Sequence, residues 1–151
     1  MTNNINRLIF AKGLTYIQFG LITVLFIAGP IIASCCNILM TIQGLGLMLG
    51  LISVYTVGLN SFSAFPTPRQ GIRLVTTGPF RYIRNPMYLA VLLCVVPICI
   101  DKPTLIKVAT VVMLLIVLFF KITVEEQLLE KQFSEYSSYK RKSWRIIPFV
   151  F

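Results

Sequence analysis

The stretch LVTTGPFRYIRNPMYL, residues Leu74–Leu89, decides how this chain folds, because it separates two hydrophobic halves and is itself basic and aromatic. It carries Arg81 and Arg84, two prolines and several aromatic side chains, and Arg73 precedes it directly. A loop that only connects two helices does not need so many arginines, prolines and aromatic residues in so short a stretch. The stretch therefore predicts a binding site for an anionic, planar group at a membrane face. The alternative is an interfacial anchor, with arginines at the lipid headgroups and aromatic rings in the interfacial belt.

The composition indicates an integral membrane protein. The chain has 151 residues, of which 56% are hydrophobic and 13% are charged, and this length predicts a single domain, residues 1–151. We expect an all-α fold with four membrane helices, the last two forming a hairpin around the break at residues 101–103. The expected helices are Leu14–Ser34, Ile38–Leu59, Met87–Ile100, which is short for a span, and Thr104–Phe120.

The domain divides into two N-terminal helices, residues 1–59, and a C-terminal part, residues 60–151. The loop Asn60–Asn85 is too apolar for disorder, so we expect it to fold back onto the helices. Pro86 suits the first turn of the third helix, and Asn85 suits its N-cap. The free amides of that turn favour a carboxylate or a phosphate.

The distribution of positive charge predicts the topology. Twelve of the fourteen lysines and arginines lie before the first expected helix, in the loop before the third, or after the fourth, and Lys102 and Lys107 lie near the opposite face. By the positive-inside rule both termini and the long loop face the cytoplasm. The net charge of +9 then reflects topology and contact with anionic headgroups, so we expect no nucleic-acid partner.

Cysteine and glycine patterns are best explained by packing. The chain has four cysteines, no CxxC pair and no histidine, so we expect no metal site. The glycines of the segment Gly44–Gly50 resemble a dinucleotide fingerprint, but no strand precedes them. Gly46 and Gly50 instead form a small-xxx-small step, which allows another helix to approach closely.

The C-terminal segment adds the acidic side chains. Lys121 and Glu125 are four residues apart and share a helical face, whereas Glu126 points about 100° away. A simple Lys121–Glu125 ion pair at the interface is the alternative to a functional role. The apolar spacing after them predicts an amphipathic cytoplasmic extension, and we expect the final segment, Ser143–Phe149, to fold over the site.

These motifs together resemble a known family. The run Leu74–Tyr88, the pair Glu125-Glu126, the pattern F-S-x-Y-x-x-Y at 133–139 and the tail Arg145–Phe149 are similar to the isoprenylcysteine carboxyl methyltransferase family. The related phospholipid methyltransferases share much of this pattern. The resemblance covers about 65–151 of the chain.

The resemblance implies a membrane methyltransferase that uses S-adenosyl-L-methionine and a lipophilic acceptor, which enters from the bilayer and is methylated on a carboxylate, amine or thiol. It implies that Lys121 handles the acceptor, and Glu126 is the candidate base where the acceptor needs one. The cofactor-binding positions that it implies are Ile72, Arg73, Leu74, Val75, Phe80, Asn85, Pro86, Met87, Tyr88 and Glu125.

The sequence is also compatible with two other classes of protein. Membrane sterol reductases share a similar C-terminal pattern and bind NADPH, and a non-enzymatic scaffold would use the charged side chains as interfacial anchors. The small size favours the bacterial inner membrane over the endoplasmic reticulum. The ordered motifs favour the methyltransferase.

Overall fold

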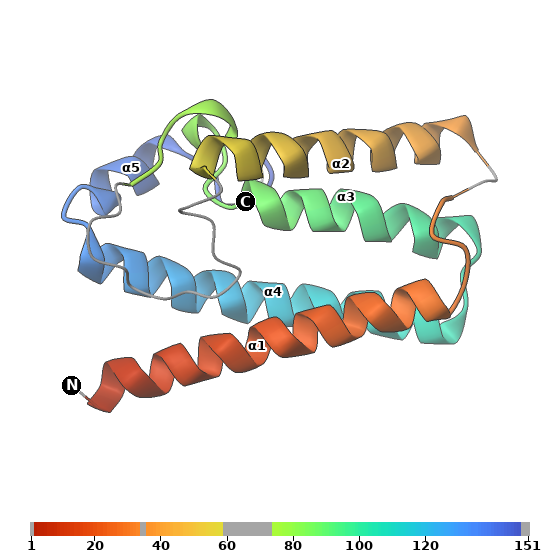
Figure 1. Ribbon diagram of the computed structural model, residues 1–151, viewed down its shortest axis with the longest axis horizontal. Coiled ribbons are helices and arrows are strands. Elements are labelled where there is room, and N and C mark those ends of the chain that lie inside the picture. Colours follow the sequence, from red (N-terminus) through yellow and green to blue (C-terminus); the bar gives the residue numbers. More distant parts are fainter. Residues whose placement is uncertain (1, 34–35, 59–73, 149–151) are drawn as a thin grey trace.

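The computed structural model describes residues 2–33, 36–58 and 74–148, which are almost entirely helical (Figure 1). Within these ranges a single parallel β-bridge joins Ile83 and Trp144. The expected all-α class is therefore confirmed for the described residues. The helices are α1 (Thr2–Ile27), α2 (Asn37–Val57), the short 3-10 helix η1 (Gly78–Arg81), α3 (Pro86–Asp101), α4 (Leu105–Gln132) and α5 (Tyr136–Lys142).

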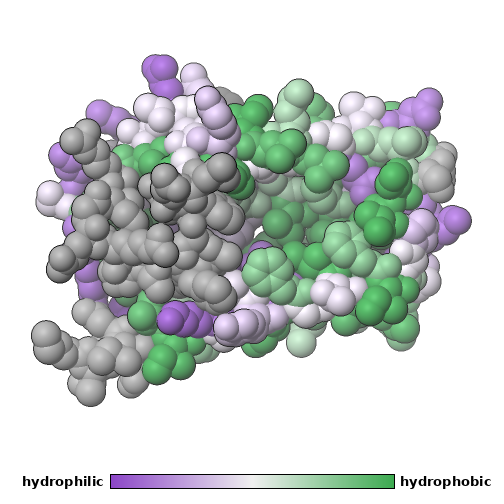
Figure 2. All heavy atoms as spheres, in the orientation of Figure 1, coloured by the Kyte–Doolittle hydropathy of each residue, from purple (hydrophilic) through white to green (hydrophobic). Residues whose placement is uncertain are grey.

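Three helices are long and apolar enough to cross a membrane: α1 from Arg7 onward, α2 and α4. Many of their large apolar side chains face outward, as in Tyr55 and Leu105. Figure 2 shows hydrophobic side chains over the middle of the helices, with hydrophilic ones mainly toward the two ends. Helix α3 has 16 residues, so it is about 24 Å long against a hydrocarbon core of about 30 Å. The expected short third helix is confirmed.

The bounds expected for the first helix, Leu14–Ser34, are wrong at both ends. Helix α1 ends at Ile27, before Gly29 and Pro30, because proline disfavours helical backbone in the residue that precedes it. At its start α1 extends back to Thr2. The Arg7 guanidinium there donates a hydrogen bond to Gln127 Oε1 at 2.9 Å, so this early part of α1 runs beside the late part of α4.

The fourth helix is longer than expected. Helix α4 does not end at Phe120 but continues without a break to Gln132, and α5 follows after a three-residue turn at 133–135. The charged residues at 121, 125 and 126 do not interrupt it, because each has a partner on another helix or on the C-terminal segment.

The helices pack most closely as α2 with α3 and α1 with α4 (Figure 1). Helices α3 and α4 are antiparallel and joined by a short turn, as the hairpin prediction requires, but their closest partners are α2 and α1. A hydrophobic cluster of Leu25, Val95, Val111, Leu114 and Leu118 joins α1, α3 and α4. The start of α1, the start of α3 and α5 all lie at one end of the bundle, on the left in Figure 1.

The close contact between α2 and α3 depends on Gly46. A Cβ atom at Gly46 would lie 2.8 Å from Leu93 Cβ and 3.1 Å from Ala90 O, whereas one at Gly50 would make an ordinary 3.5 Å contact with Ala90 Cβ. The expected small-xxx-small step is confirmed, and Gly46 is its critical member. Gly44 faces away, because a methyl group added there would have nothing within 4 Å.

We predict that Gly46→Ala destabilises the protein by about 1–3 kcal/mol, because the added methyl group forces α2 away from α3. Gly44→Ala is the matched control and is expected to be neutral or slightly stabilising, since alanine is the better helix former. Thermal unfolding of the purified variants in detergent measures the difference. Equal melting temperatures for the two variants would contradict this account of the interface.

Candidate functional site

The C-terminal residues 143–145, here called the strap, lie against the segment that leads into α3. Trp144 N donates to Tyr82 O at 2.8 Å, and Arg84 N donates to Trp144 O at 2.7 Å. One residue further on, Asn85 N donates to Arg145 O at 3.1 Å. These backbone hydrogen bonds bring together two segments about 60 residues apart in sequence. The expectation that the C-terminal segment folds over this region is confirmed for 143–145.

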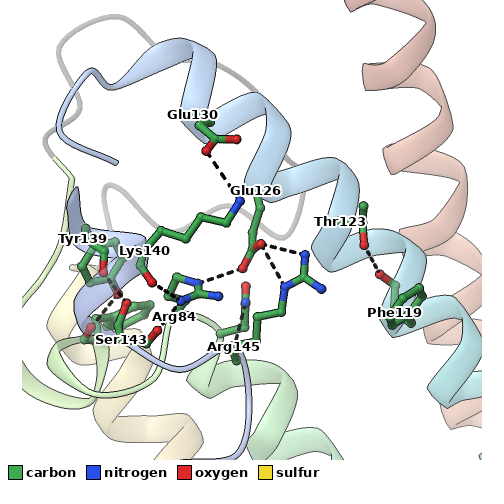
Figure 3. Close-up of polar contacts among 11 residues, drawn as sticks. Arg84, Phe119, Thr123, Glu126, Glu130, Tyr139, Lys140, Ser143 and Arg145 are labelled. Atoms are coloured by element: carbon green, nitrogen blue, oxygen red, sulfur yellow. Dashed lines mark hydrogen bonds and ion pairs between the residues drawn. The ribbon is translucent and has the colours of Figure 1, made fainter. Parts of the chain in front are cut away.

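Glu126 joins α4 to both of these segments (Figure 3). Its Oε1 accepts from Arg84 Nε at 2.9 Å, and its Oε2 lies 3.0 Å from both Nε and Nη2 of Arg145. The Glu126 side chain is 2% exposed. A buried carboxylate is tolerated when its oxygens are matched by cations and hydrogen bonds. Glu126 thus ties α4, the start of α3 and the strap into one unit.

Arg84 also holds the end of α5. Its Nη1 donates to the carbonyl oxygens of Lys140, at 2.9 Å, and of Ser143. These carbonyls belong to the last turn of α5 and its C-cap, where unsatisfied acceptors and the negative end of the helix favour a cation. Arg84 is therefore the central donor of the site, with one carboxylate and two carbonyls as acceptors.

A second polar group lies on another face of α4. Tyr88 Oη donates to Glu125 Oε2, and Lys121 Nζ lies 4.0 Å from Glu125 Oε1 and 5.2 Å from the centroid of the Tyr88 ring. The Lys121 ammonium also donates to Gln18 Oε1 of α1 at 2.9 Å. This arrangement joins α1, α3 and α4 in one buried polar group. The predicted Lys121–Glu125 pair is present, at the outer limit of an ion pair.

The two adjacent glutamates therefore serve different partners. Glu125 faces Tyr88 and Lys121, whereas Glu126 faces the arginines. Successive residues of an α-helix point about 100° apart, so one turn of α4 supplies both groups. This agrees with the directions expected from the sequence.

The turn before α3 fixes the other predicted positions. Gly78 has φ = +58°, and a Cβ there would lie 3.0 Å from Thr56 Oγ1, so this close turn against α2 favours glycine. Phe80 is half-buried, and its carbonyl accepts from Tyr139 Oη at 2.5 Å. Burial raises the pKa of the Tyr139 hydroxyl, so this donor keeps its proton near neutral pH. Leu74 and Val75 lie half-buried ahead of this turn.

Asn85 occupies the N-cap position of α3, but its side chain does not cap the helix. Its Nδ2 donates instead to Arg145 O at 3.1 Å. Pro86 is buried at the first helical position, and Met87 is half-buried after it. The first turn of α3 therefore has no side-chain cap. The expected N-cap position is right, and the expected capping hydrogen bond is replaced by a contact with the strap.

The predicted site residues fall into two groups. Tyr88, Glu125 and Lys121 are in mutual contact, and Asn85 and Glu126 both contact Arg145. The predicted positions Ile72 and Arg73 lie outside the described residues.

Gln18 and Arg145 are partners that the sequence reasoning did not assign. The signal for Gln18 was available, because it is a polar residue within an apolar membrane helix and such residues are usually partnered. Its partner could not be read from the sequence, since Lys121 lies 103 positions away. Arg145 belongs to the tail motif, but its ion pair with Glu126 depends on the position of the strap.

We predict that Glu126→Gln destabilises the protein by on the order of 3 kcal/mol, because it leaves the Arg84 and Arg145 charges without their shared anion. Glu130→Gln is the matched control: Glu130 is 41% exposed and pairs with Lys140 at 3.5 Å, so its loss costs at most about 1 kcal/mol. Thermal unfolding in detergent measures the loss of stability in both variants. The rate of tryptic cleavage at residues 140–145 measures whether the strap is released. Similar losses for the two variants would contradict a central role for Glu126.

The comparisons with known proteins identify the family. No curated protein matches the chain. The family model described as "Phospholipid methyltransferase" matches residues 36–136. This range covers α2, η1, α3 and α4 and reaches the first residue of α5, so it includes Arg84, Tyr88, Lys121 and the adjacent pair Glu125 and Glu126. Because the match spans about two thirds of a chain with three apolar helices of membrane-spanning length, this protein belongs to the phospholipid methyltransferase family of membrane methyltransferases.

Proposed function

We propose that the protein transfers a methyl group from S-adenosyl-L-methionine to a lipophilic acceptor at the site beside the start of α3. The observation that carries this proposal is the partly buried group Tyr88–Glu125–Lys121, which adjoins the first turn of α3 through Tyr88. The family match supports methyl transfer. The group that accepts the methyl is a carboxylate, an amine or a thiol.

The chemical groups of the site fit this cofactor. The cofactor carries a carboxylate, an ammonium, a sulfonium and an adenine ring. The positive end of the α3 dipole, at Pro86, Met87 and Tyr88, suits the carboxylate. The Glu125 carboxylate suits a cation, and the loop positions Leu74, Val75 and Phe80 offer apolar surface for the adenine. By resemblance, Ile72, Arg73 and Asn85 complete the cofactor site.

When bound, the cofactor supplies an activated methyl group on a sulfonium, so alignment and exclusion of water can provide most of the rate enhancement. Tyr88 orients the Glu125 carboxylate by a hydrogen bond. Lys121, which is 3% exposed and held by Gln18, presents an ammonium on the same face. This ammonium would attract a negatively charged acceptor and fix its position.

Glu126 has a positioning role. Its oxygens accept from two arginines, which suits a residue that positions the strap and Asn85. Its role as a base for an amine or thiol acceptor stays a prediction.

The placement in the membrane follows from the charges. The basic ends of α1 and α5 lie at the same end of the bundle as the site (Figure 1), whereas Lys102, in the turn after α3, and Lys107, near the start of α4, lie at the other end. The positive-inside rule favours a cytoplasmic site with both termini on that side, and the small size of the chain favours a bacterial inner membrane. The acceptor then arrives from the bilayer, with membrane lipids as the surroundings and no nucleic-acid partner.

Calorimetric titration of the purified protein in detergent tests the cofactor. We expect saturable binding of S-adenosylhomocysteine that NADPH does not displace, because the Glu125 carboxylate suits the ammonium group of this ligand better than a polyphosphate. Binding of NADPH that inorganic phosphate does not displace, without binding of S-adenosylhomocysteine, would support a sterol-reductase-like enzyme. Absence of both, with the helical circular dichroism intact, would support a non-enzymatic scaffold.

A charge substitution tests the site itself. We predict that Glu125→Ala weakens binding of S-adenosylhomocysteine by roughly 10- to 100-fold, the usual range for a lost charge-assisted hydrogen bond. Glu130→Ala, which removes an exposed acid from the same helix, should bind as the wild type does. Equal affinities of the two variants would make Glu125 a structural residue.

A further inference from the structure

A pocket lined by basic residues lies between the end of α5 and the strap. Its volume is about 360 Å³, and the side chains of Tyr88, Glu125 and Lys121 do not line it. Five cationic residues line it together with Trp144: Arg84, Lys140, Arg141, Lys142 and Arg145. It therefore differs from the proposed methyl-transfer site both in position and in charge.

The positive charge in this pocket exceeds the negative charge around it. Glu126 is shared by Arg84 and Arg145, and Glu130 pairs with Lys140 at 3.5 Å. Figure 3 shows Arg84 and Arg145 reaching Glu126 from the start of α3 and the strap, and Lys140 of α5 reaching Glu130.

Arg141 and Lys142 are exposed, and within the described part of the chain neither forms an ion pair with an acid. Two positive charges of the pocket are thus available to a ligand.

The helix end does not cancel this charge. The carbonyls at the C-terminus of α5 would repel an anion, but the Arg84 guanidinium already binds those of Lys140 and Ser143. The side chains that face the pocket are therefore dominated by guanidinium and ammonium groups, which are suited to phosphate oxygens. The methyl donor has two positive groups and one negative group, so it is a poor ligand for this pocket.

We propose that this pocket binds a phosphate group, supplied by the headgroup of an anionic phospholipid at the membrane surface. Arg141 and Lys142 provide the two unmatched cations, and Arg145 provides a guanidinium held in place by Glu126. The strap forms one wall, and its backbone is hydrogen-bonded to the residues before α3. A bound headgroup would hold the strap against the start of α3 and so couple lipid composition to the methyl-transfer site. The phosphate site itself does not depend on the proposed enzymatic activity.

Trp144 offers a direct readout, because it is the single tryptophan of the chain, lines the pocket and is 41% exposed. The full-length protein in neutral detergent micelles is titrated with phosphatidylglycerol, with phosphatidylcholine and with inorganic phosphate, and Trp144 fluorescence is recorded. We expect a saturable change with phosphatidylglycerol and none with phosphatidylcholine. A saturable change with inorganic phosphate at similar concentrations would assign the site to free phosphate instead of a lipid headgroup.

Two double variants separate the pocket from general surface charge. Arg141→Gln/Lys142→Gln should weaken the response to phosphatidylglycerol by at least about tenfold, the usual size of the loss when a charge-assisted hydrogen bond to a phosphate is removed. Lys12→Gln/Lys131→Gln removes two charges outside the pocket and should respond as the wild type does. Far-ultraviolet circular dichroism checks that both remain folded. No saturable response to any phosphate compound, or equal weakening in both variants, would overturn the proposal.

Discussion

The structure of the site depends on one carboxylate. Glu126 is buried in the last third of α4, and its two oxygens bind Arg84 from the start of α3 and Arg145 from the strap. Burial makes each of these charges costly without the others, so the three elements hold one another in place. The Nη1 atom of Arg84 also donates hydrogen bonds to backbone carbonyl groups at the C-terminal end of α5. The strap, which is otherwise attached by a few backbone hydrogen bonds, is thus fixed beside the proposed methyl-transfer site.

Two buried lysines of α4 are likewise held by oxygen acceptors from neighbouring segments. Lys107 is 2% exposed, and its ammonium donates to Lys102 O at 3.1 Å and to Ile98 O at 3.5 Å. Lys121 is almost as buried and binds Gln18 of α1. An ionisable group within a membrane helix is stable when neighbouring helices offer oxygen acceptors. Helix α1, which lies outside the family match, therefore supplies a partner to the site as well as apolar surface.

The helix pairing explains where the site can form. Gly46 lets α2 pack tightly on α3, while α1 packs along α4, and the cluster around Leu114 joins α1, α3 and α4. The polar side chains of Lys121, Glu125 and Glu126 follow this cluster along α4 toward the basic end of the bundle. Because the two glutamates point in different directions, one helical turn supports both a proposed binding group and the anchor of the strap.

The sequence by itself determined the membrane class, the break between the last two membrane helices to within one residue, the close approach at Gly46 and the resemblance to the family, because these depend on local composition and spacing. It also indicated that Lys121 and Glu125 share a face. It did not determine that α4 continues past Phe120 or that the Asn85 side chain binds the strap. Those features were decided by the tertiary structure. A charged turn stays helical and buried only when partners such as Gln18, 103 positions away, and Arg145, 19 positions away, are brought to it by packing.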